Sequence, residues 1–231
     1  MTPSVWIALK LGVGIAVALV VIRQCRKPTS WPGRFFAHLM NSRHRGLTLW
    51  GLSHVTVTRQ STVLDVGCGG GATIAELLTR APEGKVYGID FAEASVAVAR
   101  ETNATAIASG RVDIQQASVS NLPFPADRFD VVTAVETHYY WPDLRADLRE
   151  IGRVLKPGGR VALVVECYRG KRFGTVEVWA LRLLGGRCFS VDEHREALTA
   201  AGFVDVAVAE ERAKGWLTAV GTKGRSDAPP A

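Results

Sequence analysis

From residue 61 onward, short stretches rich in β-branched residues alternate with helical stretches, and this alternation restricts the fold more than any other feature. Alternating strands and helices form a mainly parallel sheet with helices on both faces. The sequence therefore predicts an α/β, doubly wound fold with a seven-stranded, mainly parallel sheet. Strands are predicted at Thr62–Val66, Lys85–Ile89, Arg111–Gln116, Phe129–Val135, Gly159–Val165, Val204–Ala209 and Leu217–Thr222, and helices at Ala72–Arg80, Ala92–Ile107, Asp143–Leu155 and Val191–Ala201.

The last of these helices has both ends marked. Ser190 and Glu193 have the spacing of a capping box, and Gly202 follows as a stop signal. The helix is therefore expected to begin directly after Ser190.

A glycine-rich turn follows the first predicted strand. The strand ends in Gly67-Cys68-Gly69-Gly70-Gly71, and a helix begins at once. Glycines let a ligand lie against the backbone of such a turn, and the N-terminus of the helix favours an anionic group. Gly67, Gly69 and Ala72 also satisfy the dinucleotide-binding spacing, so the turn alone leaves an NAD(P)-dependent oxidoreductase open.

Two acidic residues accompany this turn. Asp65 stands two residues before the first glycine, where its charge would repel a pyrophosphate and attract an ammonium group. Asp90 ends the second strand about twenty residues on, where a carboxylate can bind two ribose hydroxyls. Together they favour a ligand that joins an amino acid to a nucleoside.

Four segments in order carry a family resemblance: VLDVGCGGG, GIDFAEASVAVAR, NLPFPADRFDVV and RVLKPGGRV. Over about residues 45–222 the chain resembles the class I S-adenosylmethionine-dependent methyltransferases. It is most similar to the type 11 branch, which includes quinone-biosynthesis and sterol-type C-methyltransferases. The resemblance implies S-adenosyl-L-methionine as the cofactor and methyl transfer as the activity.

The resemblance also implies roles for individual residues. Asp65 and the turn residues would hold the methionine portion, Asp90 the ribose, and Phe91 the adenine; the turn residues are Gly67, Cys68, Gly69 and Gly71. Many relatives have an aspartate that faces the adenine amino group, and Ser118, followed by Val119, stands at that place here. A hydroxyl can accept the same hydrogen bond without charge assistance.

The acceptor is expected beyond the carboxyl ends of the strands. The loop after the fourth strand, residues 136–142, is rich in polar and aromatic groups. Its candidate catalytic residues are His138, Glu136 and Tyr139, with the first two as possible bases. In the alternative interpretation, the aromatic rings pack the loop and His138 only bonds to backbone.

The residues after the fifth strand also point to the acceptor side. Glu166, Cys167 and Tyr168 follow that strand, and the basic, aromatic insert between Gly170 and Cys188 is a candidate substrate cap. The four cysteines are scattered and form no CxxC pair, so neither a metal site nor a disulfide framework is expected.

The N-terminal segment is apolar and then basic. Val5 to Ile22 contains a single charge, Lys10, and as a helix would extend about 27 Å, enough for a bilayer core. Arg23, Arg26 and Lys27 follow directly, which favours a membrane anchor over a cleaved signal peptide; a buried soluble helix is the other alternative. The positive-inside rule then predicts a single-pass membrane protein whose catalytic domain faces the cytoplasm.

Charge mapping completes the predicted organisation. Residues 1–64 hold eight basic and no acidic residues, whereas the remainder carries a net charge of −2, which argues against a nucleic-acid partner. We expect an anchor at 1–22, a basic linker with a helix at 23–60, the methyltransferase domain at 61–223 and a disordered tail at 224–231. The helix, Arg34–His54, would either pack on the domain edge or cover the substrate site.

The predicted function is methyl transfer to a small-molecule or lipid-like acceptor at the cytoplasmic membrane face. An oxidoreductase and a non-catalytic, cofactor-binding membrane protein are the alternatives. The sequence leaves the acceptor atom and the oligomeric state open.

Overall fold

The computed structural model describes residue 6 and residues 43–170, 175–183 and 185–225. The predicted anchor apart from Trp6, the linker and most of the predicted tail lie outside these residues. Within the described ranges, no helix is both long and apolar enough to traverse a bilayer. The anchor and the residue 224–231 tail stay predictions.

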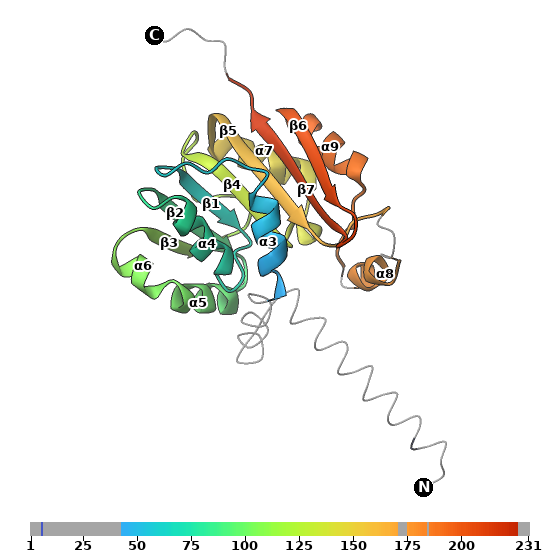
Figure 1. Ribbon diagram of the computed structural model, residues 1–231, viewed down its shortest axis with the longest axis horizontal. Helices are drawn as coiled ribbons and strands as arrows, with labels where there is room; N and C mark the ends of the chain where they lie inside the picture. Colours follow the sequence, from blue (N-terminus) through green and yellow to red (C-terminus); the bar gives the residue numbers. More distant parts are fainter. Residues whose placement is uncertain (1–5, 7–42, 171–174, 184, 226–231) are drawn as a thin grey trace.

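The domain is built on one seven-stranded sheet with the order β3-β2-β1-β4-β5-β7-β6 (Figure 1). Strands β1 to β5 run parallel, and β7 is antiparallel to both β5 and β6. The predicted fold is therefore confirmed. The strands are β1 Thr62–Val66, β2 Lys85–Asp90, β3 Val112–Gln116, β4 Phe129–Val135, β5 Leu155–Val165, β6 Phe203–Glu211 and β7 Trp216–Lys223.

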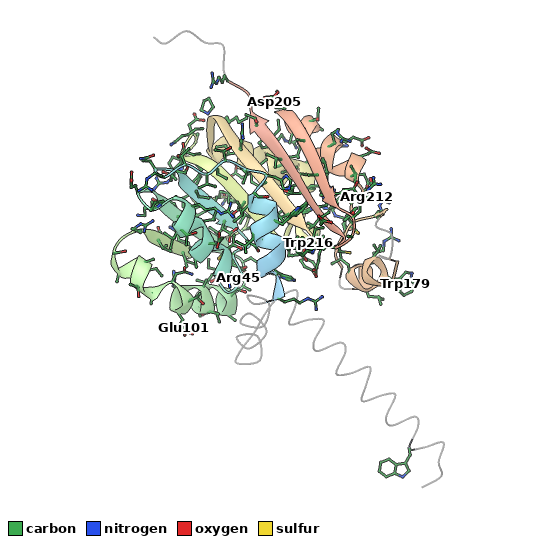
Figure 2. The ribbon with its side chains drawn as sticks, in the orientation of Figure 1. Arg45, Glu101, Trp179, Asp205, Arg212 and Trp216 are labelled. Carbon is green, nitrogen blue, oxygen red and sulfur yellow. The ribbon has the colours of Figure 1, made fainter. Side chains whose placement is uncertain are left out.

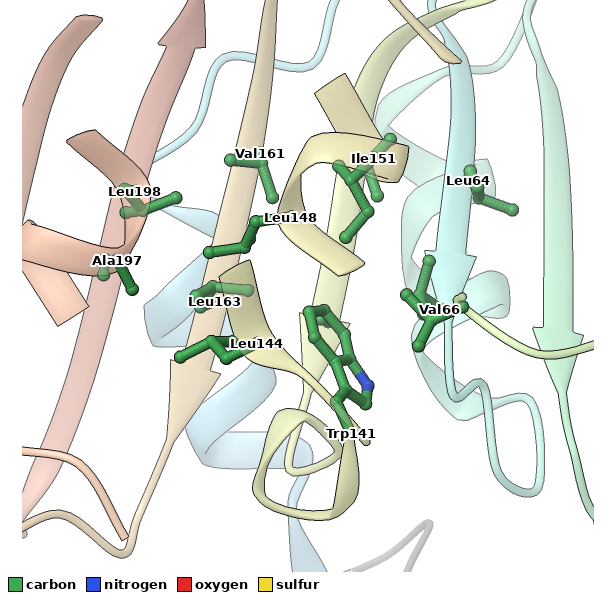
Figure 3. Close-up of a cluster of buried hydrophobic side chains, with 14 of the residues drawn as sticks. Leu64, Val66, Trp141, Leu144, Leu148, Ile151, Val161, Leu163, Ala197 and Leu198 are labelled. Carbon is green, nitrogen blue, oxygen red and sulfur yellow. The ribbon is translucent and has the colours of Figure 1, made fainter. Parts of the chain in front are cut away.

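Helices cover both faces of the sheet, as the periodicity requires. One face buries apolar side chains of α7 and α9, and Figure 3 shows Leu148 and Leu198 of these helices near Leu163 of β5. The other face buries side chains of α3, α4 and α5, among them Leu52 and Ile74. The helices are α3 Arg45–Leu52, α4 Ala72–Arg80, α5 Glu93–Thr102, α6 Ala104–Ala108, η1 His138–Tyr140, α7 Leu144–Val154, α8 Thr175–Leu183 and α9 Val191–Ala200.

The predicted helix Ala92–Ile107 is wrong in one respect, because the structure divides it into α5 and α6. The division falls at Asn103, which is buried. Its side-chain amide donates to the carbonyl oxygens of Ala99 (2.9 Å) and Gly71 (3.0 Å). Asn103 thus ends α5 and at the same time fastens it to the glycine turn.

Two strand boundaries differ from the prediction by two residues or more, and the predicted start of α9 is confirmed. Strand β5 begins at Leu155 rather than Gly159, because Leu155 already pairs with Phe129 of β4. Strand β6 continues beyond the predicted Ala209, because Glu211 still pairs with Trp216 of β7. The capping box of Ser190 and Glu193 is present at the start of α9.

Helix α3 packs closely on the sheet. A Cβ placed on Gly51 would lie 2.4 Å from a methyl group of Val164, so only glycine lets this helix approach β5. The part of the predicted helix Arg34–His54 that the structure describes therefore packs against the sheet. Its N-terminal end, preceded by His44, lies at the edge of the sheet where the parallel strands end (Figure 1).

Candidate active site

The polar residues of interest follow directly after parallel strands that are neighbours in the sheet. Gly67 follows β1, Asp90 ends β2, Glu136 follows β4 and Glu166 follows β5. The chain leaves β1 toward β2 and β3 and later returns to β4 on the other side, so the edge beside β1 and β4 is the switch point of the fold. Ligands bind at such points in doubly wound sheets.

The glycine turn joins the two sides of this edge. Gly67 has a φ of 71°, and a Cβ on it would lie 2.1 Å from the hydroxyl oxygen of Thr137, which follows β4. Gly69 has a φ of 52°, and nothing lies within 4 Å of its missing Cβ. The open space for a ligand is therefore beside Gly69. Gly71 instead faces α5, where a Cβ would lie 2.9 Å from the backbone of Ala99.

Asp65 lies in β1, and almost none of it is exposed. Its Oδ1 accepts a hydrogen bond from the Thr133 hydroxyl of β4 (2.7 Å). Burial raises the pKa of Asp65 to about 7, the Thr133 bond lowers it, and the charge of Asp90 raises it further. A ligand ammonium group would remove this penalty by pairing with the carboxylate.

Asp90 fastens the end of β2 to the glycine turn. Its carboxylate accepts hydrogen bonds from the backbone N–H groups of Gly69 (3.0 Å) and Ala92 (2.9 Å). Burial raises the pKa of Asp90, and these two bonds oppose the rise. Phe91, the next residue, is exposed, as a side chain that lies against an adenine should be before it is covered.

Of the three other predicted cofactor residues, two have buried side chains and one has an exposed side chain. Cys68 is buried beside β2, and burial raises the pKa of its thiol well above the usual value. Val119 is buried in the core. Ser118 is exposed, and its hydroxyl accepts a hydrogen bond from the backbone of Ser120. Cys68 and Val119 can thus contact a ligand through their backbone, whereas Ser118 retains a usable hydroxyl.

Glu136 has the most unusual setting in the loop after β4. Its φ of 57° is rare for a residue with a side chain. Its Oε1 accepts hydrogen bonds from the backbone N–H of Glu166 (2.5 Å) and from the Tyr139 hydroxyl (2.8 Å). Burial raises the pKa of Glu136 to about 7, although the charge of His44 lowers it. A carboxyl group with such a pKa can accept a proton at neutral pH.

Tyr139 supports Glu136 from below the surface. The ring is buried, and the hydroxyl both donates to Glu136 and accepts from the backbone N–H of Cys167 (3.0 Å). Burial raises the pKa of Tyr139 well above its usual value, and the nearby Glu136 charge adds to the rise. These contacts favour a positioning role for Tyr139.

His138 points to a different partner. Its Nε2 lies 2.9 Å from Nε2 of His194 on α9, and both rings are buried. Nδ1 of His194 lies 2.7 Å from the Ser190 carbonyl oxygen and must donate its proton there. In the neutral ring this leaves Nε2 of His194 as an acceptor, so Nε2 of His138 is the donor of the hydrogen bond between the two rings. Burial and the neighbouring His194 hold the pKa of His138 well below its usual value. These contacts favour a packing role for His138. Trp141 is buried too, which favours a packing role for the aromatic rings of this loop.

His44 and Glu166, which were not among the predicted catalytic residues, lie beside Glu136. Nε2 of His44, just before α3, lies 3.6 Å from Oε1 of Glu166, and Nη2 of Arg43 lies 3.4 Å from the same oxygen. Burial lowers the pKa of His44, but the Glu166 hydrogen bond and the charges of Glu136 and Glu166 outweigh it, so the pKa is raised overall.

These three side chains form what we call the acid–base cluster: His44, Glu136 and Glu166. One nitrogen or oxygen of each lies within 4.8 Å of the others, a spacing that would also admit a metal ion. Because Glu136 Oε1 already accepts two protein hydrogen bonds, we interpret the group as acid–base machinery. No sequence spacing could have linked residue 44 to residue 166.

Two of the cysteines, Cys167 and Cys188, are in contact. Sγ of Cys167, after β5, lies 3.7 Å from Sγ of Cys188, which follows the insert. Both side chains are reduced thiols, and the hydrogen bond from Cys167 lowers the pKa of Cys188 while burial opposes the shift. This contact joins the C-terminal end of the insert to the residue that follows Glu166.

Comparison with known proteins decides the family. A family model described as a methyltransferase domain matches residues 63–159. The chain is 30% identical over 129 residues to the uncharacterized methyltransferase YdaC of Bacillus subtilis. The aligned region covers 56% of this chain and 69% of YdaC. The chain belongs to the class I S-adenosylmethionine-dependent methyltransferases.

Other relatives of this methyltransferase agree in sequence and fold. It is 35% identical over 103 residues to the ubiquinone/menaquinone biosynthesis C-methyltransferase UbiE of Geotalea daltonii, covering 44% of each protein. The fold matches human N-acetylserotonin methyltransferase in complex with S-adenosylmethionine, with a TM-score of 0.67 at 19% identity, over 82% of this chain and 55% of that one. The chain therefore spans about half the length of these two proteins.

The cofactor of this methyltransferase is S-adenosylmethionine, and the described residues fit it. Asp65 offers a buried carboxylate to the ammonium group, and the space beside Gly69 leaves the backbone accessible. Asp90 and exposed Phe91 lie on the β2 side, where the nucleoside would follow. The oxidoreductase alternative is not favoured by these findings.

Proposed function

We propose that this methyltransferase transfers the methyl group of S-adenosylmethionine to a small-molecule or lipid-like acceptor at the cytoplasmic face of a membrane. The observation that carries the proposal is the position of Glu136. It follows β4 at the switch point, has a pKa of about 7, and lies one residue before Thr137, which contacts the glycine turn. The acceptor would bind over the ends of β4 and β5.

When bound, the cofactor would supply an electrophilic methyl group on a sulfonium sulfur, and the methyl–sulfur bond would break to leave the neutral thioether S-adenosylhomocysteine. Asp65 and Asp90 orient it from the β1–β2 side, so that the acceptor approaches from the β4–β5 side. Glu136 accepts the acceptor's proton as the acceptor forms its bond to the methyl carbon, and Tyr139 fixes the carboxylate for that step. His44 and Glu166 hold charge beside Glu136 and can take up the proton afterward.

Three features support the membrane location and an apolar acceptor. The predicted anchor precedes the domain, and all of the net positive charge lies in residues 1–64. The insert adds a helix, α8, whose Trp179 and Leu183 side chains are exposed. The UbiE relative, by its name, acts in the biosynthesis of ubiquinone and menaquinone.

The test is to incubate membrane and soluble fractions of host extract with the full chain and methyl-labelled S-adenosylmethionine, followed by mass spectrometry. A labelled product that is absent with Glu136→Gln, and whose acceptor comes from the membrane fraction, is the expected result. Tight binding of S-adenosylhomocysteine with no labelled product in either fraction would instead favour a non-catalytic, cofactor-binding protein.

A further inference from the structure

Helix α8 carries the largest exposed apolar side chains of the insert. Trp179 is 67% exposed and Leu183 is 68% exposed. They are four residues apart, so they lie on the same side of the helix. The other large exposed apolar residues of the described chain, Trp6, Phe91 and Val204, are not neighbours of one another in the sequence.

The opposite side of α8 is apolar as well. Leu181 is only 7% exposed, and Val178 packs against the main core. A helix at the surface of a soluble domain normally turns a polar face to water. An apolar inner side and an apolar outer side together indicate a helix between the protein core and a second apolar medium.

The charges of the insert indicate which medium this is. Residues 169–187 contain five basic residues and one acidic residue, Glu177. Arg182, between Trp179 and Leu183 along the chain, is exposed, and so is Arg187. A short helix with tryptophan and leucine on one side and arginine beside them is typical of a helix in the interface of an anionic bilayer.

We propose that α8 docks on the surface of an anionic lipid bilayer. Trp179 and Leu183 enter the boundary between head groups and acyl chains, and Arg182 binds the anionic head groups. Leu181 and the Cys167–Cys188 contact hold the helix to the domain, so docking fixes the domain's orientation.

The place of α8 in the fold gives this docking a consequence. The parallel strands point toward the bottom of Figure 1, and α8 lies at the lower right, beyond the end of β5. Figure 2 shows Trp179 at that lower edge and Asp205, near the start of β6, at the top. The docked surface is thus on the same side as the edge that carries Glu136 and Glu166. In this respect the inference rests on the proposed function.

The test uses the full chain bound to vesicles whose lipids carry brominated acyl chains, which quench tryptophan fluorescence on contact. One set of vesicles is phosphatidylcholine alone, and the other also contains phosphatidylglycerol. We expect part of the quenching to be lost in Trp179→Phe, and this part to be larger with phosphatidylglycerol. Arg182→Glu should reduce it.

A matched control places a tryptophan on the far side. In the Trp179→Phe background, Val204→Trp puts an indole at an exposed apolar position beside Asp205, and the fluorescence that it adds to that of the Trp179→Phe chain should not be quenched. Equal quenching of wild type and Trp179→Phe, or full quenching of the Val204→Trp indole, overturns the proposal. So does a fluorescence shift that depends on protein concentration without lipid, which assigns α8 to a second copy of the chain.

This readout needs neither cofactor nor acceptor. If methyl transfer fails while Trp179 is quenched, the docking stands and the proposed function falls. If labelled product forms while Trp179 is not quenched, the opposite holds.

Discussion

Asp65 is a predicted cofactor residue whose pKa is strongly raised by folding. Its pKa of about 7 means that a proton occupies the carboxylate increasingly as the pH falls below 7. Because an ammonium group pairs only with the charged form, cofactor binding must displace this proton. We expect the affinity for S-adenosylhomocysteine to be steady above pH 7 and to fall below it, approaching tenfold per pH unit. Calorimetric titration at several pH values measures this.

Asp65→Asn isolates the charge. It should weaken binding by roughly tenfold to a hundredfold at pH 8, since a hydrogen bond to a charged group contributes about 1.5–3 kcal/mol, and it should flatten the pH dependence. Asp192→Asn, an exposed change on α9, serves as the control and should leave both unchanged. A pH-dependent affinity that survives in Asp65→Asn would assign the proton to another group.

Glu136 makes a separate prediction for turnover. A base with a pKa of about 7 is charged above that pH, so the methyl-transfer rate should rise between pH 6 and 8 with an inflection near 7. Glu136→Gln should lower the rate by about 10²–10⁴-fold and remove the inflection. Steady-state rates at saturating cofactor measure both effects.

Substitutions at Tyr139 and His138 also test the assignment of Glu136 as the base. The Tyr139 hydroxyl bond lowers the pKa of Glu136, so Tyr139→Phe should move the inflection to higher pH. His138→Asn should lower thermal stability, because it breaks the buried pair with His194, but should leave the inflection in place. An inflection lost in His138→Asn and kept in Glu136→Gln would restore His138 as the base.

At the scale of elements, Asn103 joins α5 to the glycine turn. Asn103→Ala removes the two bonds of a buried amide and leaves the Gly71 carbonyl oxygen without this donor. We expect a loss of about 1–3 kcal/mol in the free energy of unfolding, together with weaker binding of S-adenosylhomocysteine. Thermal melts with and without ligand measure both. Thr199→Ala, at an exposed position on α9, is the control and should change neither.

Asn103 also shows why a local sequence pattern did not predict the division between α5 and α6. Periodicity predicted one helix over residues 92–107, because Asn103 differs little from other polar residues in a local pattern. Its effect comes from Gly71, which is 32 positions earlier and comes near only in the folded chain. The positions of the seven strands and the mainly parallel sheet were predictable, since alternation and turn residues are local signals.

The candidate site divides in the same way. Asp65, Asp90 and Glu136 could be selected because each lies at or near the end of a predicted strand, and parallel strands bring their ends together. His138 looked equivalent to Glu136 because only the packing of α9 reveals its buried partner, His194. His44 joins the cluster only because Gly51 lets α3 lie directly on β5.

At the scale of the molecule, the switch point separates two tasks. The β1–β2 side carries the predicted cofactor residues, and the β4–β5 side carries Glu136 and Glu166 of the acid–base cluster. The Gly67–Thr137 contact is where the two sides touch. In the proposed function, a cofactor bound across this contact would present its methyl group beside Glu136.

The last prediction concerns the whole chain, where an apolar segment of eighteen residues is followed directly by basic residues. If that segment spans a bilayer, the full chain should sediment with membranes, resist extraction by high salt, and dissolve only in detergent. High salt separates this from docking through α8 alone, because screening weakens the attraction of arginine to anionic lipids. Replacing Val13 and Val17 by aspartate should release the chain into the salt-washed supernatant, since charges at the bilayer centre are costly. A wild-type chain that salt alone removes would leave α8 and the basic linker as its means of membrane attachment.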